Sequence, residues 1–341
     1  MSTVATEHFR APEEIVGTPA VEVHDLAKRY GDLAAVDGID FSVAQGEIFA
    51  FLGPNGGRQV HNHQDVVHLG PPHPTSGRAM VAGFDVASQA KSVRRGIGLV
   101  FQEPTLDDQL TAEENLRFHA VLYGVPRGQV DERIPRVLEL VALSKRRKDL
   151  VSTYSGGMAR RLEIARGMLH TPKVLFLDEP TVGLDPQTRF LIWEDIQRLR
   201  MEEGVTIFLT THYMDEAEYA ERIAIIDHGL IIALDTPDVL KASVGSDTVQ
   251  LETADDDTAL GLLVQAGYRV ERTEHGLTVF VANEEAAVGP SVTATGVPVR
   301  TVRAHRPTLD DVFLHFTGRE IREQHGEAAS MFARAHGARR G

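Results

Sequence analysis

The order of apolar and polar positions predicts strands that alternate with helices along the first two thirds of the chain. Three apolar runs, VLFLD (174–178), VTIFLTTH (205–212) and RIAIID (222–227), have the length and the branched side chains of buried strands. Helical patterns separate them at residues 186–201 and around 214–220. Strands and helices that alternate in this way form a largely parallel sheet covered by helices, so we expect an α/β fold.

Local signals mark the ends of several of these elements. Thr111 followed by Glu114 has the spacing of a capping box, so we expect a helix to begin there. A second helix is expected where apolar residues recur on one face between residues 134 and 141. A tight hairpin is expected at His228 and Gly229.

The pattern changes after about Lys241, where acidic and small residues lead into short strands and one helix that ends near Phe316. We therefore expect a second, smaller α+β domain after the main one. The two ends of the chain are polar or rich in Ala, Gly and Arg, which favours disorder. The expected divisions are a flexible lead (1–19), a main α/β domain (20–241) with an inserted helical subdomain (about 103–155), an accessory domain (242–320) and a disordered tail (321–341).

Composition narrows the classes of function. The 341 residues include no cysteine, which excludes a disulfide scaffold and is compatible with a reducing compartment. The net charge of −14 disfavours a nucleic-acid partner, because the phosphate backbone selects basic surfaces. No apolar run reaches the ~18 residues that span a bilayer, so any membrane role needs a separate partner chain.

A glycine pair marks one candidate ligand site, in the run YSGGM (154–158). Ser155 is a good helix N-cap, and Gly156 and Gly157 let the backbone come close to a ligand. The free amides and the dipole at the start of the following helix attract an anion. In isolation the same run is equally compatible with an ordinary helix start.

Polar side chains at strand ends form a second candidate site. Asp178 and Glu179 end a buried strand, which is typical of a magnesium-holding acid beside a base that activates water. His212 and Gln102 end two other apolar runs. Taken singly, these residues are also compatible with a solvated turn, a structural histidine and a surface amide.

The ordered set of these motifs resembles the ATP-binding cassette (ABC) family over about residues 21–240. YSGGM resembles the family's signature sequence, and VLFLDEP (174–180) resembles its Walker B strand. GLD (183–185) resembles the D-loop, FQ the Q-loop, and THY (211–213) the switch-histidine region. LGPNG (52–56) resembles the first half of a Walker A loop. The resemblance implies a P-loop ATPase domain with an antiparallel β subdomain and an inserted helical subdomain.

The resemblance also implies a role for each matched residue. Asp178 would hold Mg²⁺ through water, and Gln102 would ligate Mg²⁺ while sensing the membrane subunit. Glu179 would be the general base for the attacking water, and His212 would contact the γ-phosphate of ATP. Tyr30 would stack on the adenine, although a core aromatic beside a strand is compatible with the same position.

The signature residues imply a homodimer. Ser155 and Gly157 would cap the γ-phosphate of the ATP held by the opposite protomer, with Gly156 and the D-loop residue Asp185 beside them in the nucleotide site. Active cassettes of this family work as head-to-tail pairs with two ATP molecules sandwiched between them. The resemblance therefore implies a dimer of the ATPase subunit, with ATP and Mg²⁺ as its ligands.

The C-terminal segment refines the resemblance. RPTLDDVF (306–313) followed by TGRE (317–320) looks like the end of the daunorubicin-resistance type of exporter ATPase. This implies an ATP-hydrolysing subunit that powers a separate ABC permease for drug-type efflux from the cytoplasmic face of the membrane. The alternatives are a catalytically impaired, regulatory cassette and a non-transport ABC protein that acts on ribosomes or DNA. An intact base and switch histidine argue against the first, and a single cassette without sustained heptads argues against the second.

The phosphate-binding loop departs from the family pattern G-x-x-x-x-G-K-[ST]. In that pattern backbone amides cradle the phosphates, the lysine reaches the β- and γ-phosphates, and the hydroxyl ligates Mg²⁺. This chain lacks the last glycine, the lysine and the hydroxyl. The positions that match the loop, and that we assign to nucleotide binding, are Gly53, Pro54, Asn55, Gly56, Gly57, Gln59 and Val60.

Three explanations of this departure remain open. The clustered His61, His63 and His68 are compatible with a transition-metal site. The second explanation is a degenerate cassette that does not hydrolyse ATP. The third, which we favour, is a local reading-frame error over residues 57–74, because a back-translation advanced by one base permits AGKSTTIKMLCTLVRP, a complete P-loop and its helix. Family-like sequence resumes at TSG (75–77).

Overall fold

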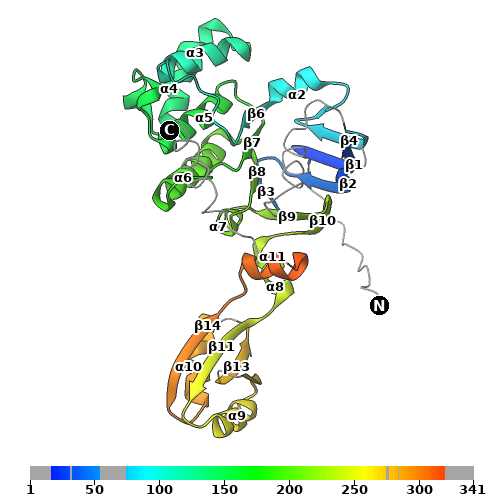
Figure 1. Cartoon of the computed structure of the whole chain (residues 1–341), viewed down its shortest axis with the longest axis vertical. Coiled ribbons are helices and arrows are strands. Elements are labelled where there is room, and N and C mark those ends of the chain that lie inside the picture. The colour runs from blue at the N-terminus through cyan, green and yellow to red at the C-terminus, as the bar shows by residue number, and fades with distance from the viewer. Residues whose placement is uncertain (1–16, 31–32, 54–73, 274–275, 283, 319–341) are drawn as a thin grey trace, which may run out of the picture. The chain divides into compact units, whose positions relative to one another are not determined.

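The chain divides into two compact units, residues 1–236 and 237–341 (Figure 1). Each unit has its own sheet and its own apolar core. The computed structural model describes residues 17–30, 33–53, 74–273, 276–282 and 284–318.

A six-stranded sheet forms the centre of the first unit, in the order β10-β9-β3-β8-β7-β6. Neighbouring strands from β9 to β6 pair in parallel, whereas β10 is antiparallel to β9. Every residue of β3, β7 and β8 is buried, which explains why these strands are mostly continuous apolar runs. The predicted α/β class with a largely parallel sheet is confirmed. The strands are β3 (Ile48–Leu52), β6 (Ile97–Val100), β7 (Val174–Asp178), β8 (Thr206–Thr211), β9 (Arg222–Asp227) and β10 (Leu230–Asp235).

A four-stranded antiparallel sheet, in the order β2-β1-β4-β5, shares its apolar core with the main sheet. Phe41 of β2 stacks on Phe49 of β3, with ring centroids 5.6 Å apart, and lies 6.1 Å from the ring of Phe208 on β8. Aromatic side chains therefore fill the space between the two sheets. This sheet is the antiparallel β subdomain that the family resemblance implied. Its strands are β1 (Val21–Tyr30), β2 (Leu33–Val43), β4 (Ser76–Val81) and β5 (Phe84–Asp85).

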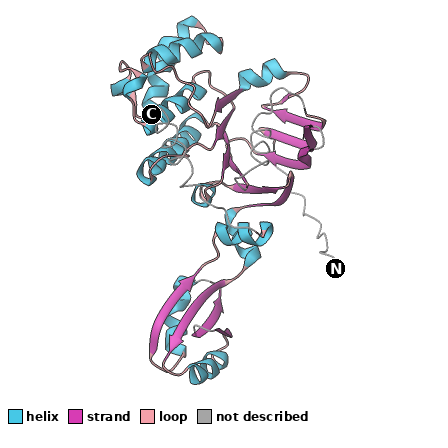
Figure 2. Cartoon of the chain, viewed as in Figure 1, coloured by secondary structure: helices cyan, strands magenta, loops and turns pink. Residues whose placement is uncertain are grey.

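Helices complete the first unit, and α3, α4 and α5 gather on the side of the main sheet away from the antiparallel sheet (Figure 2). Thr111 and Glu114 form the predicted capping box at the start of α3, because each side chain accepts from the other residue's amide. The predicted turn at His228 and Gly229 joins β9 to β10. The helices are α2 (Ala90–Gly96), α3 (Ala112–Leu122), α4 (Arg127–Leu140), η2 (Ser144–Arg146), η3 (Val151–Thr153), α5 (Gly156–Met168), α6 (Pro186–Glu203) and α7 (Met214–Ala217).

The second unit is an antiparallel sheet, in the order β12-β13-β11-β14, with α9 and α10 packed on one face. Val249, Leu251 and Leu277 form part of the core between sheet and helices. The expected helix ending near Phe316 is confirmed as α11, but the expectation of a single helix was wrong, because four helices lie within the described residues of this unit. Pro290 inside α10 weakens the helical signal in the sequence, and packing on the sheet overrides it. The elements are α8 (Pro237–Val244), β11 (Asp247–Thr253), α9 (Asp256–Gln265), β12 (Arg269–Thr273), β13 (Gly276–Val281), α10 (Glu284–Ala294), β14 (Val299–His305) and α11 (Leu309–Thr317).

Candidate functional site

Three neighbouring strands deliver polar side chains to one edge of the main sheet. Gln102 lies two residues after β6, Glu179 directly follows β7, and His212 directly follows β8. Because these strands are adjacent and parallel, their carboxyl ends meet at the same edge. The structure therefore brings together three of the residues that the sequence predicted for the site.

The carboxylate of Glu179 joins the other two side chains. Its Oε2 accepts a hydrogen bond from Nε2 of Gln102 at 2.9 Å, and its Oε1 lies 3.1 Å from Nδ1 of His212. An ionised carboxylate only accepts hydrogen bonds, so the proton in the second contact belongs to Nδ1 of His212. The side chains of Glu179 and His212 are only 12% and 8% exposed, so this pair is largely shielded from bulk water.

The backbone at Glu179 adopts an unusual conformation. Its φ angle is +43°, in the left-handed region that residues with a side chain seldom occupy. The amide of Glu179 donates to the carbonyl of Thr210 at 3.1 Å, so the adjacent strand holds this conformation in place. Backbone strain of this kind concentrates at functional sites, where surrounding contacts over-determine the local geometry.

Asp178 is the last residue of β7 and is almost fully buried. Its Oδ1 accepts a hydrogen bond from Oγ1 of Thr210 at 2.6 Å. The described residues contain no group of three acidic, His or Cys side chains that could hold a metal ion. A nucleotide-bound Mg²⁺ needs only one or two protein ligands, because phosphates and water supply the others. The carboxylate of Asp178 and the amide oxygen of Gln102 therefore fit as donors to a Mg²⁺ that arrives with its nucleotide.

Arg160 of α5 is a buried cation that the sequence analysis did not single out. Its guanidinium donates to the carbonyls of Asp178 at 2.9 Å, Glu179 at 3.0 Å and Pro180 at 2.6 Å. It also donates to the carbonyl of Phe101, which precedes the Q-loop glutamine. Burial lowers the pKa of Arg160, and these contacts offset part of the cost of burying its charge. One side chain thus positions the backbone around the candidate base.

The signature run begins a helix, as the sequence predicted. Ser155 is the N-cap of α5, and its hydroxyl accepts from the amide of Met158 at 3.3 Å. A Cβ atom at Gly157 would lie 2.3 Å from Cγ2 of Thr188, so the packing of α5 on α6 requires a glycine there. Ser155 and Gly156 are exposed, so a second molecule can reach the start of this helix.

Asp185 has a local role that the sequence analysis missed. It is the N-cap of α6, with Oδ1 accepting from the amide of Thr188 at 3.0 Å and Oδ2 from its hydroxyl at 2.6 Å. These hydrogen bonds from Thr188 hold the pKa of Asp185 below its ordinary value. Pro186 at the first helical position was the available signal, since proline is favoured directly after an N-cap. The same Thr188 contacts Gly157, which links the D-loop to the signature helix.

Two further predicted positions lie within the described residues. Tyr30 at the end of β1 is 42% exposed, with Nζ of Lys28 5.2 Å from the ring centre. The alternative that this residue is a core aromatic is therefore wrong. Gly53 directly follows β3, whose Leu52 pairs in register with Thr211, so the loop begins beside His212. Outside the described residues lie Pro54, Asn55, Gly56, Gly57, Gln59 and Val60 of the loop, together with His61, His63 and His68.

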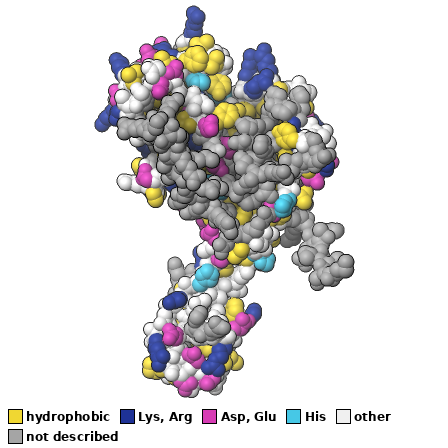
Figure 3. Space-filling view, in the orientation of Figure 1, with side chains coloured by type: hydrophobic (Ala, Val, Ile, Leu, Met, Phe, Trp, Pro, Cys, Tyr) yellow, Lys and Arg dark blue, Asp and Glu magenta, His cyan; other side chains and the backbone are white. Residues whose placement is uncertain are grey.

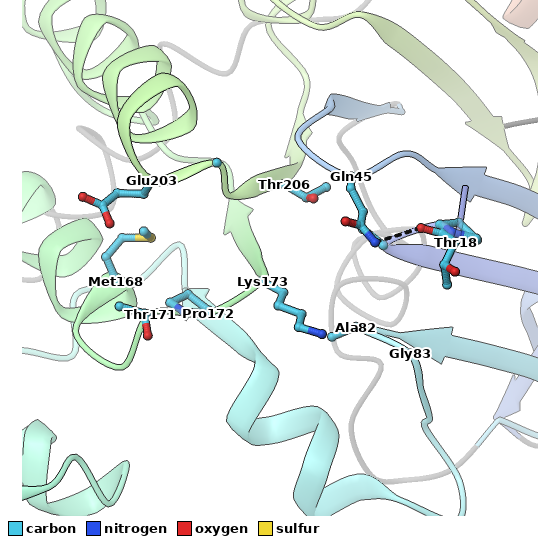
Figure 4. A pocket seen from close by; sticks show the side chains of 13 residues that line it. Thr18, Gln45, Ala82, Gly83, Met168, Thr171, Pro172, Lys173, Glu203 and Thr206 are labelled. Atoms are coloured by element: carbon cyan, nitrogen blue, oxygen red, sulfur yellow. Dashed lines mark hydrogen bonds between the residues drawn. The ribbon is translucent and has the colours of Figure 1, made fainter. Parts of the chain in front are cut away.

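A cavity of about 520 Å³ lies at the opposite edge of the main sheet (Figure 4). Its lining includes Gln45, Lys173 and Thr206, which lie at the amino ends of β3, β7 and β8. Ligands of open α/β sheets bind at the carboxyl ends of the strands. This cavity contains none of the predicted site residues, so it is separate from the candidate site.

Comparison with known proteins agrees with this geometry. The ABC transporter family matches residues 36–182. The chain is 38% identical to the daunorubicin resistance ATP-binding protein DrrA3 of Streptomyces coeruleorubidus, over 89% of this chain and 97% of that protein. It is 36% identical to the linearmycin resistance ATP-binding protein LnrL of Bacillus subtilis (strain 168), over 89% of this chain and 100% of that protein.

Solved structures show the same fold. An ATP-binding subunit of an ABC transporter superposes with a TM-score of 0.57 at 27% identity, covering 66% of this chain and 92% of that one. The carboxyl-end site on a parallel sheet, the signature helix and these likenesses together define an ATP-binding cassette protein, and the chain belongs to the ABC transporter family. Within this family it resembles the daunorubicin-resistance type of ATP-binding protein.

Proposed function

We propose that this protein is the ATP-hydrolysing subunit of an ABC exporter for drug-like compounds, and that it powers a separate membrane permease. Relatives with similar sequences carry names that refer to drug resistance or to export. The observation that supports hydrolysis most directly is the carboxylate of Glu179, held between Gln102 and His212. A cassette that only bound nucleotide would have no evident need for this arrangement.

In this proposal Glu179 is the general base. Its carboxylate would accept a proton from a water molecule as the water oxygen attacks the γ-phosphorus, while the bond to the bridging oxygen breaks and ADP leaves. His212 in its protonated form would donate to a γ-phosphate oxygen through Nε2, because Nδ1 faces Glu179. Mg²⁺ held by Asp178 and Gln102 would neutralise charge on the phosphates.

ATP would be enclosed between two copies of the chain arranged head to tail. Ser155, Gly156 and Gly157 of one protomer would contact the γ-phosphate bound by the other. The start of α5 suits this contact, since the amides of a helix N-terminus bind anions and both Ser155 and Gly156 are exposed. Tyr30, also exposed, would stack on the adenine.

A permease contact is proposed for the exposed apolar face of α3. Within the described ranges, no helix has both the length and the apolar character needed to cross a bilayer. Phe118, Val121 and Leu122 are 57%, 78% and 63% exposed, and their spacing places them on one face of the helix. Apolar side chains are also visible around α3, at the top of the view in Figure 3. Exposed apolar clusters mark interaction sites, so this face fits an apolar partner such as a permease segment.

A buried polar cluster joins the helical segment to the catalytic edge. Glu163 of α5 accepts from the amide of Thr105 at 2.7 Å and pairs with Arg166 at 2.7 Å. Thr105 lies three residues after Gln102, so displacement of the helices by a permease would act on the loop that carries this glutamine. We infer that this cluster couples permease contact to the Glu179 site.

The test uses the full chain with residues 57–72 replaced by AGKSTTIKMLCTLVRP, the loop-restored chain. Glu179→Gln keeps the size of the side chain and removes the base, so phosphate release should fall about 10²- to 10⁴-fold. ATP should still bind, and the variant should run as a dimer with Mg-ATP and as a monomer without it in size-exclusion chromatography. Glu139→Gln on the exposed side of α4 is the matched control, and it should keep the phosphate release and the oligomeric state of the loop-restored chain.

The two readouts separate the parts of the proposal. Near-normal phosphate release by Glu179→Gln would remove this residue from the catalytic role. Slow release without an ATP-dependent dimer would keep the base and exclude the head-to-tail sandwich.

A regulatory cassette is the second candidate function. The observation that favours it is the run GGRQV (56–60), which lacks the lysine and the hydroxyl of a phosphate loop. If the chain binds Mg-ATP only weakly with this loop, it would act through its partner contacts and not through hydrolysis.

A further inference from the structure

Glu216 of α7 is a buried carboxylate that the proposed mechanism does not use. It is 1% exposed, and its Oε2 accepts a hydrogen bond from Oγ1 of Thr211 at 2.7 Å. Its Oε1 accepts from Oγ1 of Thr181. Both threonines are buried as well. A single carboxylate therefore joins two segments that approach each other only in the folded chain.

Each of these segments carries a residue of the candidate site. Thr181 lies in the turn that follows Glu179 and leads into α6. Thr211 directly precedes His212, and its Oγ1 also accepts from the amide of Tyr213 at 3.0 Å. The contacts of Thr211 thus restrain the backbone on both sides of His212.

Several charged groups face Glu216 from the elements around it. Nη2 of Arg189 on α6 lies 3.6 Å from its Oε1 and 3.0 Å from Oδ1 of the neighbouring Asp215. Asp215 acts against ionisation of Glu216, whereas Arg189 and His212 favour it. Arg160 of α5 also interacts with this charge. The ionised form of Glu216 is therefore favoured by nearby cations and opposed by one neighbouring carboxylate.

Burial raises the pKa of Glu216 to about 7, against the opposing effects of the hydrogen bond from Thr211 and the charge of Arg189. A carboxylate accepts from both threonine hydroxyls. A protonated carboxyl has one O–H oxygen, which is an uncharged and weaker acceptor, so protonation weakens or reverses one of the two contacts. The hydroxyls of Thr181 and Thr211 therefore both donate to a charged carboxylate only while Glu216 is ionised.

We propose that Glu216 is a positioning residue for ATP hydrolysis: its carboxylate holds the segment of His212 against the turn of Glu179. This inference rests on the proposed role of Glu179 as the base. Loss of the clamp would let the His212 segment move relative to Glu179, while the residues assigned to ATP binding stay in place. The expected consequence is slower hydrolysis with little change in KM for ATP.

The experiment measures kcat and KM of the loop-restored chain between pH 6 and pH 8.5. Glu216→Gln imitates the protonated form in size and charge. The parent's kcat should rise as the pH passes through about 7, whereas the variant should be roughly 10- to 100-fold slower and flat over this range, with KM within about twofold. Asp215→Asn removes an exposed carboxylate from the same helix, beside the same Arg189. Because Asp215 acts against ionisation of Glu216, this variant should keep the pH-dependent rise in kcat, with its midpoint moved to a lower pH.

A pair of variants at Thr211 provides an independent test. Thr211→Val removes the hydroxyl at almost unchanged volume and should lower kcat, whereas Thr211→Ser keeps the hydroxyl and should restore it. If Glu216→Gln fails to fold by circular dichroism, the serine and valine comparison decides. Equal kcat for both Thr211 variants, or a parent-like pH profile in Glu216→Gln, would overturn the clamp. The proposed function would still stand in that case if Glu179→Gln is inactive. Full turnover in both glutamine variants would also remove Glu179 from the role of base, on which the clamp rests.

Discussion

Replacing Arg160 with methionine should destabilise the first unit strongly. Methionine keeps an unbranched side chain of similar reach and removes the charge and all the hydrogen bonds. The guanidinium donates to four backbone carbonyls, and each such bond from a charged group contributes ~1.5–3 kcal/mol. Their simple sum would be ~6–12 kcal/mol, but removing the arginine also removes the cost of burying a cation.

The variant leaves buried carbonyls without this donor and removes the cation that interacts with Glu163, Asp178 and Glu216, so the net loss should be ~3–5 kcal/mol. This is a large part of the ~5–15 kcal/mol that stabilises a typical domain. The loss should fall on the first unit, because Arg160 and all four carbonyls lie within it. Helix α5 would also lose its attachment to the turn around Glu179 and to the start of the Q-loop.

Urea unfolding followed by Trp193 fluorescence measures this loss. Trp193 is the chain's one tryptophan, is 2% exposed and stacks on Tyr219 at 4.7 Å, so its emission reports the first unit. Arg95→Met on the exposed side of α2 is the matched control and should change the free energy of unfolding by less than ~0.5 kcal/mol. A loss below ~1 kcal/mol in Arg160→Met, with an unchanged denaturant slope, would show that the four carbonyls do not depend on this side chain.

Three further predictions concern the loop and the clamp. Without the loop lysine and hydroxyl, the chain should bind Mg-ATP about two to four orders of magnitude more weakly than the loop-restored chain, since two charge-assisted contacts of ~1.5–3 kcal/mol each are missing. Titration with labelled ATP measures both affinities, and equal affinities would contradict the prediction. Sequencing of the gene from an independent isolate should find the shifted frame between codons 55 and 76, and clean DNA without Gly-Lys-Ser/Thr in any frame would instead establish the degenerate cassette. The raised pKa of Glu216 means that its protonated form stabilises the fold fully below about pH 4.5, and that this contribution of ~3 kcal/mol is lost as the pH rises through about 7. The difference in unfolding free energy between the parent chain and Glu216→Gln should therefore vary between pH 5 and pH 8. A constant difference would refute the shifted pKa.

Local chemistry explains which parts of the structure were predictable. The capping box of Thr111 and Glu114 and the N-cap at Ser155 each involve residues three positions apart, so sequence spacing was enough to predict them. The meeting of Gln102, Glu179 and His212 was predictable for a different reason. Polar residues directly after parallel strands reach one edge of the sheet whatever the details of packing.

The hydrogen bonds of Arg160 and Glu216 around the site were not predictable in this way. Arg160 binds carbonyls of the main chain, one of them 59 positions away, and carbonyl groups leave no mark in the sequence because every residue has one. The hydroxyl of Thr181 and the carboxylate of Glu216 are 35 positions apart, and nothing in their spacing indicates that they meet. Only the close approach of α5, α6 and α7 to the strand ends places these partners within hydrogen-bond reach.

The amino-acid sequence is therefore sufficient for the α/β class, the order of the motifs and the identity of the candidate base, because these depend on periodicity and on residue type at strand ends. It is insufficient for α10, whose Pro290 argues against a helix that packing on the sheet nevertheless stabilises. It is equally insufficient for the charge of Glu216, because the cost of removing a carboxylate from water depends on how completely the surrounding side chains bury it. Desolvation and long-range distance are properties of the packed chain, and they decide the charge and the hydrogen-bond partners of each buried acid.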